Sequence, residues 1–112
     1  MRDYKLYLDD ILEAAKRIEK YTKGLNLEKL KRDDLTIDGI VRNLEIIGEA
    51  AKNIPANIKE KYPETEWKKI SGLRDILAHE YFGVDIEVLW DIIKNKLPIL
   101  KQQIVHILKN AE

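Results

Sequence analysis

Apolar side chains recur every three to four residues along most of this 112-residue chain, the spacing typical of amphipathic helices. The first stripe begins at Tyr4. The second is predicted to begin at Thr36 and to end before Pro55, which cannot continue a helix. The positions expected to face the core are Tyr4, Leu8, Ile11, Leu12, Ala15 and Ile18 in the first helix, and Ile37, Ile40, Leu44, Ile47, Ala51 and Ile54 in the second.

Two further long helices are predicted in the second half of the chain. One runs from about Glu64 toward Tyr81, and the other begins after Asp85, which can cap it. The apolar stripe of the last helix keeps its phase through Pro98, so we expect one long helix that is kinked there. The expected core positions are Trp67, Ile70, Leu73 and Leu77, then Ile86, Leu89, Ile93, Leu97, Leu100, Ile104, Ile107 and Leu108.

Shorter signals complete the predicted fold. Asn26 can cap a turn over residues 27–30, and at most a short helix fits around residues 58–62. No useful stretch alternates with period two, so no strands are expected. We therefore predict an all-α fold, an antiparallel up-and-down bundle of four main helices, in a single domain spanning residues 1–112.

Composition narrows the class of protein. The chain is 45% apolar and 36% charged, with 20 basic and 20 acidic residues, which favours a globular protein over a disordered segment. A net charge of zero argues against bulk electrostatic capture of nucleic acid, so any such binding must use a local patch. No apolar run approaches the roughly 20 residues of a membrane span, and we expect a cytoplasmic protein.

Several familiar kinds of active site are excluded. The chain has no cysteine, its five glycines are scattered, and Ser71 is its only serine. His79-Glu80 resembles the start of a zinc-binding helix, but Gly83 stands where the second histidine is needed. The only other histidine, His106, belongs to a different helix, so no metal site is expected.

The segment 72–83 concentrates the remaining chemistry, because it contains Arg74, His79 and Tyr81. On a helix, Arg74 and Tyr81 share a face, whereas His79 points about 140° away from Arg74. Either the helix ends or deforms before His79, or Arg74 and His79 meet across a dimer. A purely structural role is the alternative: Arg74 would pair with a carboxylate, His79 would cap the last carbonyls and Tyr81 would pack in the core.

Arg74-x4-His79-x-Tyr81 matches the Arg-x4-His-x-Tyr motif of the HEPN superfamily, and the chain resembles its HepT-like toxins. The resemblance extends over nearly the whole chain. It includes Arg42-Asn43-Leu44-Glu45-Ile46-Ile47-Gly48-Glu49-Ala50-Ala51-Lys52, then Trp67-x2-Ile70-x-Gly72-Leu73-Arg74, then Tyr81-Phe82-Gly83-Val84-Asp85 with Trp90, and finally Leu97-Pro98.

This resemblance implies a fold, an activity and a partner. It implies an all-helical bundle and a ribonuclease that needs no metal or other cofactor and works as a homodimer. It also implies a toxin–antitoxin pair in which an MntA-like nucleotidyltransferase transfers AMP to Tyr81 and silences the nuclease. The catalytic roles would fall on Arg74 and His79.

The chemistry of RNA suits these residues. The 2′-hydroxyl next to the scissile phosphate is a built-in nucleophile, so cleavage needs proton transfer and charge stabilisation. Histidine suits proton transfer because its ordinary pKa is near 6.5, and the guanidinium of arginine suits phosphate oxygens. One chain supplies a single motif histidine, and a two-fold dimer would bring a second His79.

Weaker candidates surround the motif. Asp75 and Glu80 could orient His79, or could simply be exposed. Arg42, Glu45, Glu49 and Lys52 form a charged stripe that is either a solvated face or a wall of the active cleft. Trp67, Trp90 and His106 are expected to be structural. A local RNA-facing patch could be formed by Lys68, Lys69, Lys94, Lys96 and Lys101.

Two other functions stay open at this stage. The chain could be a non-catalytic subunit that holds a nucleotide or substrate for a nucleotidyltransferase. It could also be a structural dimeric bundle in which Arg74 and His79 pair internally.

Overall fold

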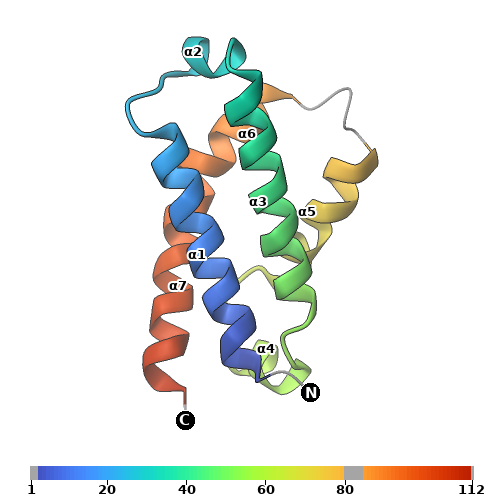
Figure 1. Cartoon of the computed structure of the whole chain (residues 1–112). Coiled ribbons are helices and arrows are strands. Elements are labelled where there is room, and N and C mark those ends of the chain that lie inside the picture. Colours follow the sequence, from blue (N-terminus) through green and yellow to red (C-terminus); the bar gives the residue numbers. More distant parts are fainter. Residues whose placement is uncertain (1–2, 80–84, 112) are drawn as a thin grey trace.

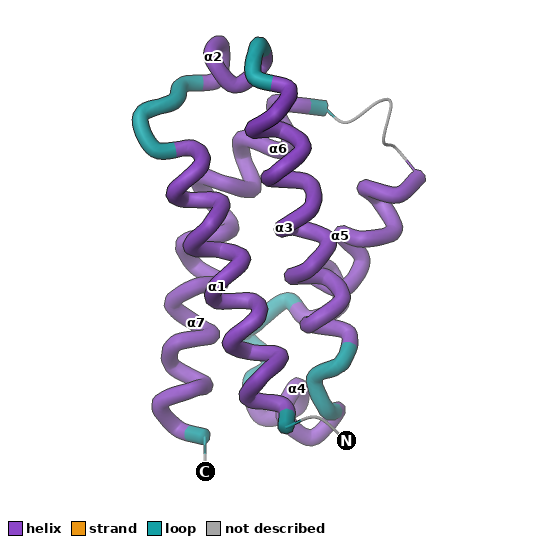
Figure 2. Tube along the Cα trace, in the orientation of Figure 1, coloured by secondary structure: helices purple, strands orange, loops and turns teal. Residues whose placement is uncertain are grey.

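The computed structural model describes residues 3–79 and 85–111, without the side chains of residues 74–79. All regular secondary structure in this part of the chain is helical, which confirms the predicted all-α class (Figure 2). The elements are α1 (Tyr4–Thr22), α2 (Leu27–Lys31), α3 (Asp34–Lys52), α4 (Ala56–Lys61), α5 (Trp67–His79), α6 (Ile86–Asp91), the π-helical segment η2 (Ile92–Lys96) and α7 (Leu97–Asn110).

The long helices alternate in direction, and α3 lies between α1 and α5 (Figure 1). The closest packing joins α3 to α1 on one side and to α5 on the other, while α7 packs against α1. The short helices α2 and α4 lie at opposite ends of the molecule. No helix in the described ranges is long and apolar enough to cross a membrane.

The core is made of the predicted stripes. Leu8, Ile11 and Ile18 of α1 are fully buried, as are Ile40 and Leu44 of α3. Burying one such side chain stabilises the fold by about 1.5–3 kcal/mol relative to leaving it exposed. The predicted core position Leu77 lies outside the described side chains. The rest of the buried apolar set is Ala14, Ala15, Leu30, Val41, Ile47, Ala50, Ala51, Ile54, Tyr62, Trp67, Leu89, Ile93, Leu97, Leu100, Ile104 and Ile107.

Helix starts follow side-chain capping. The predicted caps Asn26 and Asp85 are confirmed: each accepts a backbone N–H from the first turn of its helix, over 2.9 Å. The predicted start of the second long helix at Thr36 is wrong. Asp33 is the cap instead. Its Oδ1 accepts a hydrogen bond from the Thr36 backbone N–H at 3.0 Å, and its Oδ2 accepts one from the Thr36 hydroxyl at 2.7 Å. These hydrogen bonds lower the pKa of Asp33.

The last helical region contains a π-helical turn directly before Pro98. The Leu97 N–H donates to the Ile92 carbonyl, five residues back, instead of the carbonyl four residues back. A proline has no N–H to give to the carbonyl four residues earlier and crowds it, so a wider turn before Pro98 relieves both problems. The kink expected at Pro98 itself stays a prediction.

Candidate active site

α5 carries the motif arginine and histidine, and its first turn is firmly anchored. Trp67 is 7% exposed, and its Nε1–H donates to the Tyr62 carbonyl over 3.0 Å. Ile70 and Leu73 are partly buried against the core. The long helix predicted from about Glu64 therefore begins at Trp67, after a turn in which the Thr65 N–H donates to the Tyr62 carbonyl.

Arg74, Asp75 and His79 all belong to α5, which stays helical through His79. The first sequence alternative, a helix that ends or deforms before His79, is therefore wrong. A meeting of Arg74 and His79 across a dimer stays a prediction. Glu80 and Tyr81 lie outside the described residues.

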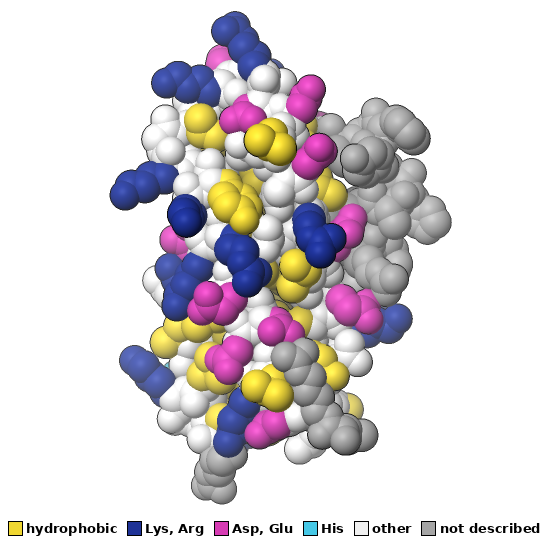
Figure 3. All heavy atoms as spheres, viewed as in Figure 1, with side chains coloured by type: hydrophobic (Ala, Val, Ile, Leu, Met, Phe, Trp, Pro, Cys, Tyr) yellow, Lys and Arg dark blue, Asp and Glu magenta, His cyan; other side chains and the backbone are white. Residues whose placement is uncertain are grey.

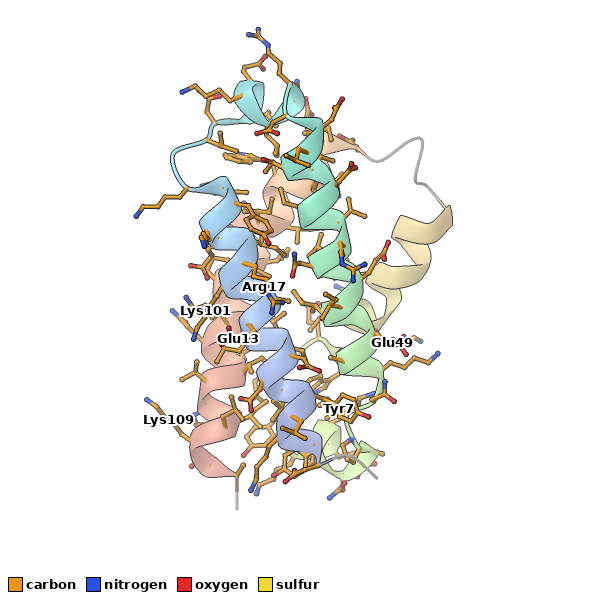
Figure 4. The ribbon with its side chains drawn as sticks, in the orientation of Figure 1. Tyr7, Glu13, Arg17, Glu49, Lys101 and Lys109 are labelled. Atoms are coloured by element: carbon orange, nitrogen blue, oxygen red, sulfur yellow. The ribbon has the colours of Figure 1, made fainter. Side chains whose placement is uncertain are left out.

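The charged stripe of α3 lies on the helix that packs against α5. Arg42, Glu49 and Lys52 are exposed, and Glu45 is partly buried. Glu49 projects from α3 on the side where α5 lies (Figure 4). Arg42, Glu45 and Lys52 make no ion pair with any residue whose side chain is described.

A cavity of about 370 Å³ lies between α3, α5 and the η2–α7 region. At its edge, Lys69 Nζ lies 2.7 Å from Glu66 Oε2, and this exposed pair lowers the pKa of Glu66 and raises the pKa of Lys69. Most of the residues that line this cavity are apolar, so it suits apolar packing better than proton transfer. The apolar lining residues are Leu44, Ile47, Ile70, Leu73, Ile92, Leu97, Ile99 and Leu100, and the polar ones are Glu64, Glu66, Lys69, Lys96 and Gln103.

The two tryptophans and His106 have structural contacts. Trp90 is partly buried against the core, with Lys94 Nζ 4.6 Å from its ring centroid. The exposed His106 meets the Tyr62 ring edge-on at 6.0 Å. Together with the anchored Trp67, these contacts fit the structural roles expected from the sequence.

The predicted lysine patch is largely engaged within the chain. Lys101 Nζ lies 3.0 Å from Glu19 Oε1, which ties α7 to α1. Lys69 pairs with Glu66, and Lys94 lies over Trp90. Three of the five lysines therefore already have partners on the protein.

Sequence reasoning missed a polar pair between α1 and α3. The Arg17 guanidinium donates through Nη1 to Asn43 Oδ1 over 3.4 Å, and Asn43 is 4% exposed. The available signal was an asparagine next to Leu44 in the apolar part of the second helix, because a buried amide needs partners.

Comparison with known proteins places the chain. The family model for HepT-like ribonucleases matches residues 11–107, which include the whole motif segment. A probable ribonuclease HepT of Thermococcus cleftensis is 46% identical over 100 residues, covering 89% of this chain and 91% of the relative. A protein of Caldanaerobacter subterraneus subsp. tengcongensis, named as a candidate RNase, is 39% identical over 112 residues, covering all of both chains.

A longer relative shares the same region. A Methanocaldococcus jannaschii protein, whose name joins gamma-glutamylcyclotransferase with a candidate RNase, is 40% identical over 111 residues, and this chain spans 50% of its length. No solved structure gives a significant match. The family model and the near-complete coverage of several relatives together show that the chain belongs to the HepT-like ribonuclease family.

Proposed function

We propose that this protein is a metal-independent endoribonuclease that acts as the toxin of a toxin–antitoxin pair. The observation that carries the proposal is the family match over residues 11–107, which includes Arg74, His79 and Tyr81. The helical backbone of α5 supports it, since it places Arg74 and His79 five residues apart on one helix.

In the proposed reaction, Arg74 binds and polarises the scissile phosphate while His79 transfers protons. The 2′-hydroxyl loses its proton and attacks the phosphorus, the bond to the 5′-oxygen breaks, and that oxygen takes up a proton. The products are a 2′,3′-cyclic phosphate and a 5′-hydroxyl. Asp75, Glu80, Glu49 and Arg42 are proposed as supporting residues around this pair.

A homodimer supplies what one chain lacks. The reaction uses a base and an acid, but each chain has one motif histidine. Positions 74 and 79 of a regular helix point about 140° apart, so a two-fold axis beside α5 would let Arg74 of one protomer work with the partner's His79.

Tyr81 is proposed as the acceptor of AMP, which an MntA-like nucleotidyltransferase antitoxin transfers from ATP. The phenol oxygen bonds to the α-phosphorus, the bond from the α-phosphorus to the bridging oxygen of the β-phosphate breaks, pyrophosphate leaves, and the phenol proton passes to water. The added group is anionic and bulky, so it would occupy the space that the substrate phosphate needs beside Arg74. A mass increase of one or more AMP units on the Tyr81 peptide is expected with the partner enzyme and ATP. Modification of the same peptide in Tyr81→Phe would contradict this assignment.

Incubation of the purified protein with total RNA in EDTA tests the nuclease. We expect fragments with 2′,3′-cyclic phosphate ends, and a loss of at least about 100-fold in Arg74→Ala and in His79→Ala. The matched controls are Arg32→Ala and His106→Ala, whose exposed side chains lie on α2's C-terminal cap and on α7. These controls should keep full activity.

Three results would contradict the proposal. Strict dependence on added metal would exclude the mechanism, and retained cleavage in either motif variant would exclude that residue. RNA binding without cleavage by the wild-type protein would instead favour a substrate-holding subunit of a nucleotidyltransferase complex. Growth arrest on expression of this chain alone, relieved by the partner, is the corresponding test in cells.

A further inference from the structure

The seam between α1 and α3 brings four side-chain positions together. Arg17 and Tyr21 lie one turn apart on α1, and Gly39 and Asn43 lie one turn apart on α3. Arg17 reaches from α1 toward α3 in Figure 4. We name this set the seam site.

Asn43 holds the guanidinium of Arg17. Its Nδ2 donates to the Gly39 carbonyl over 2.8 Å, so its Oδ1 faces Arg17 and accepts from Nη1 over 3.4 Å. This assignment is forced, because a guanidinium can only donate and a carbonyl can only accept. The buried Asn43 amide thus orients an exposed arginine, and the described residues provide one hydrogen-bond acceptor for its guanidinium, Asn43 Oδ1.

The charge of Arg17 is not neutralised within the described ranges. No carboxylate there forms an ion pair with Arg17. Glu13, one turn earlier on α1, pairs instead with Lys16 at 3.7 Å. Arg42, the neighbour of Asn43, is likewise exposed and without an ion pair in the same residues.

Tyr21 adds an exposed aromatic ring beside this charge. Its side chain is 40% exposed, and ring atoms Cδ2 and Cε2 would lie 3.3 Å from a Cβ placed on Gly39. Glycine therefore leaves the room in which the ring rests against α3. The other exposed large apolar residues in the described ranges, Leu6, Leu35, Val88 and Ile99, do not belong to this set.

An available guanidinium and an exposed ring, four residues apart on one helix, match what single-stranded RNA offers. Phosphate oxygens accept from arginine, and unstacked bases stack on aromatic rings. Acidic and basic side chains are interspersed over this face (Figure 3), which disfavours non-specific attraction and favours a few oriented contacts. An apolar protein interface would expose a larger continuous apolar patch.

We propose that the seam site binds a single-stranded stretch of the RNA substrate, with a phosphate on Arg17 and a base on Tyr21. This inference rests on the proposed ribonuclease function. Because α3 separates α1 from α5 and packed helices lie 8–10 Å apart, the axis of α1, which carries Arg17 and Tyr21, is at most about 16–20 Å from the axis of the motif helix. Asn43 is a positioning residue that acts through Arg17.

Binding of a fluorescein-labelled single-stranded RNA, measured by anisotropy in a His79→Ala background, tests the proposal without cleavage. Arg17→Gln should weaken binding about 5- to 10-fold and lower the salt slope by about 1. Tyr21→Leu keeps apolar packing against Gly39 but removes the ring, and should weaken binding about 10-fold. Arg32→Gln removes the same charge elsewhere and should bind like its parent.

Cleavage provides a second readout that a structural role would not move. In the otherwise wild-type protein, Arg17→Gln should lower kcat/KM for a long RNA about 5-fold or more. It should leave kcat/KM unchanged for a dinucleotide, which is too short to reach from α5 to α1. Thermal unfolding should show that each variant is folded.

The outcomes separate this inference from the proposed function. Wild-type affinity in both Arg17→Gln and Tyr21→Leu would overturn the seam site even if the protein cleaves RNA. If Arg32→Gln weakened RNA binding as much as Arg17→Gln, the loss would follow from net charge alone, and the seam site would also be overturned. Loss of binding to the nucleotidyltransferase, with RNA affinity unchanged, would show a protein interface instead. Absence of cleavage in the wild type would contradict only the nuclease, because the binding arm does not need it.

Discussion

Side chains between α1 and α3 are more completely buried than the described apolar side chains of α5 next to the cavity. Leu8, Ile11 and Ile18 of α1 are fully buried, as are Ile40, Leu44 and Ile47 of α3, whereas Ile70 and Leu73 of α5 are only partly buried beside a cavity of about 370 Å³. Polar groups follow the same division. The Thr22 hydroxyl of α1 donates to the Ile18 carbonyl over 2.8 Å, while the Thr65 hydroxyl before α5 is buried without a hydrogen-bond partner in the described structure.

This difference assigns separate tasks to the two regions. Fully buried apolar side chains supply stability, and segments with fewer buried contacts open at lower free energy. The motif residues Arg74 and His79 belong to α5, whose preceding residues Ile70 and Leu73 border that cavity. We infer that α1 and α3 form the rigid frame on which the motif helix is mounted.

The largest expected contrast comes from the same truncation in both regions. Ile40→Ala should lower the free energy of unfolding by about 2–5 kcal/mol, because Ile40 is fully buried. Ile70→Ala should cost about half as much, since its side chain borders the cavity. Urea unfolding of both variants measures the difference. Equal losses would show that α5 is packed as tightly as α3.

A matched pair of threonines tests the polar contrast. Thr22 and Thr65 are both 3% exposed, and valine replaces either hydroxyl with a methyl of similar size. Thr22→Val should lower the free energy of unfolding by about 1 kcal/mol, because it removes a hydrogen bond. Thr65→Val should be neutral or stabilising, since it removes an unsatisfied hydroxyl. A comparable loss in both would refute the contrast.

The smallest expected effect concerns the start of α3. Asp33→Ala should lower Tm by a few degrees at pH 7, because the cap to Thr36 is lost. The pKa of Asp33 is lowered by those hydrogen bonds, so its stabilisation is present above the unfolded pKa near 3.9 and is lost as pH falls through the folded pKa.

The difference in Tm between wild type and Asp33→Ala should therefore shrink in acid. Asp33→Asn is the control, because asparagine can cap without ionising. A difference that stays constant between about pH 7 and about pH 3 would contradict a role for the carboxylate charge.

The burial pattern could be predicted because apolar residues recur in the sequence with the period of a helix. Among the expected core positions, Leu8 and Ile104 are fully buried, and Leu12 is partly buried at the edge of the core. The positions at which helices begin were harder to predict from the sequence. Thr36 and Asp33 are both good capping residues, and only the backbone geometry decides which one accepts the hydrogen bond.

The candidate site was predictable only as far as residue types and motif spacing carry it. Arg74, His79 and Tyr81 are candidates because of their residue types and motif spacing. Their roles stay predictions, because their assembly into a site depends on contacts that no spacing encodes. The Arg17–Asn43 contact joins residues 26 positions apart on two helices, so it depends on how α1 and α3 are set against each other. The π-helical turn in η2 likewise depends on backbone hydrogen bonds, which the spacing of apolar residues does not reveal.

The central position of α3 has a consequence for sequence change. One face of this helix packs against α1 and another packs against α5. If a substitution leaves a void on one face, α3 cannot shift to fill it without losing packing on the other face. Substitutions in α3 should therefore be tolerated less well than equally buried ones in α7. Random mutagenesis of the whole chain should show the fewest accepted replacements along α3, including positions remote from the motif.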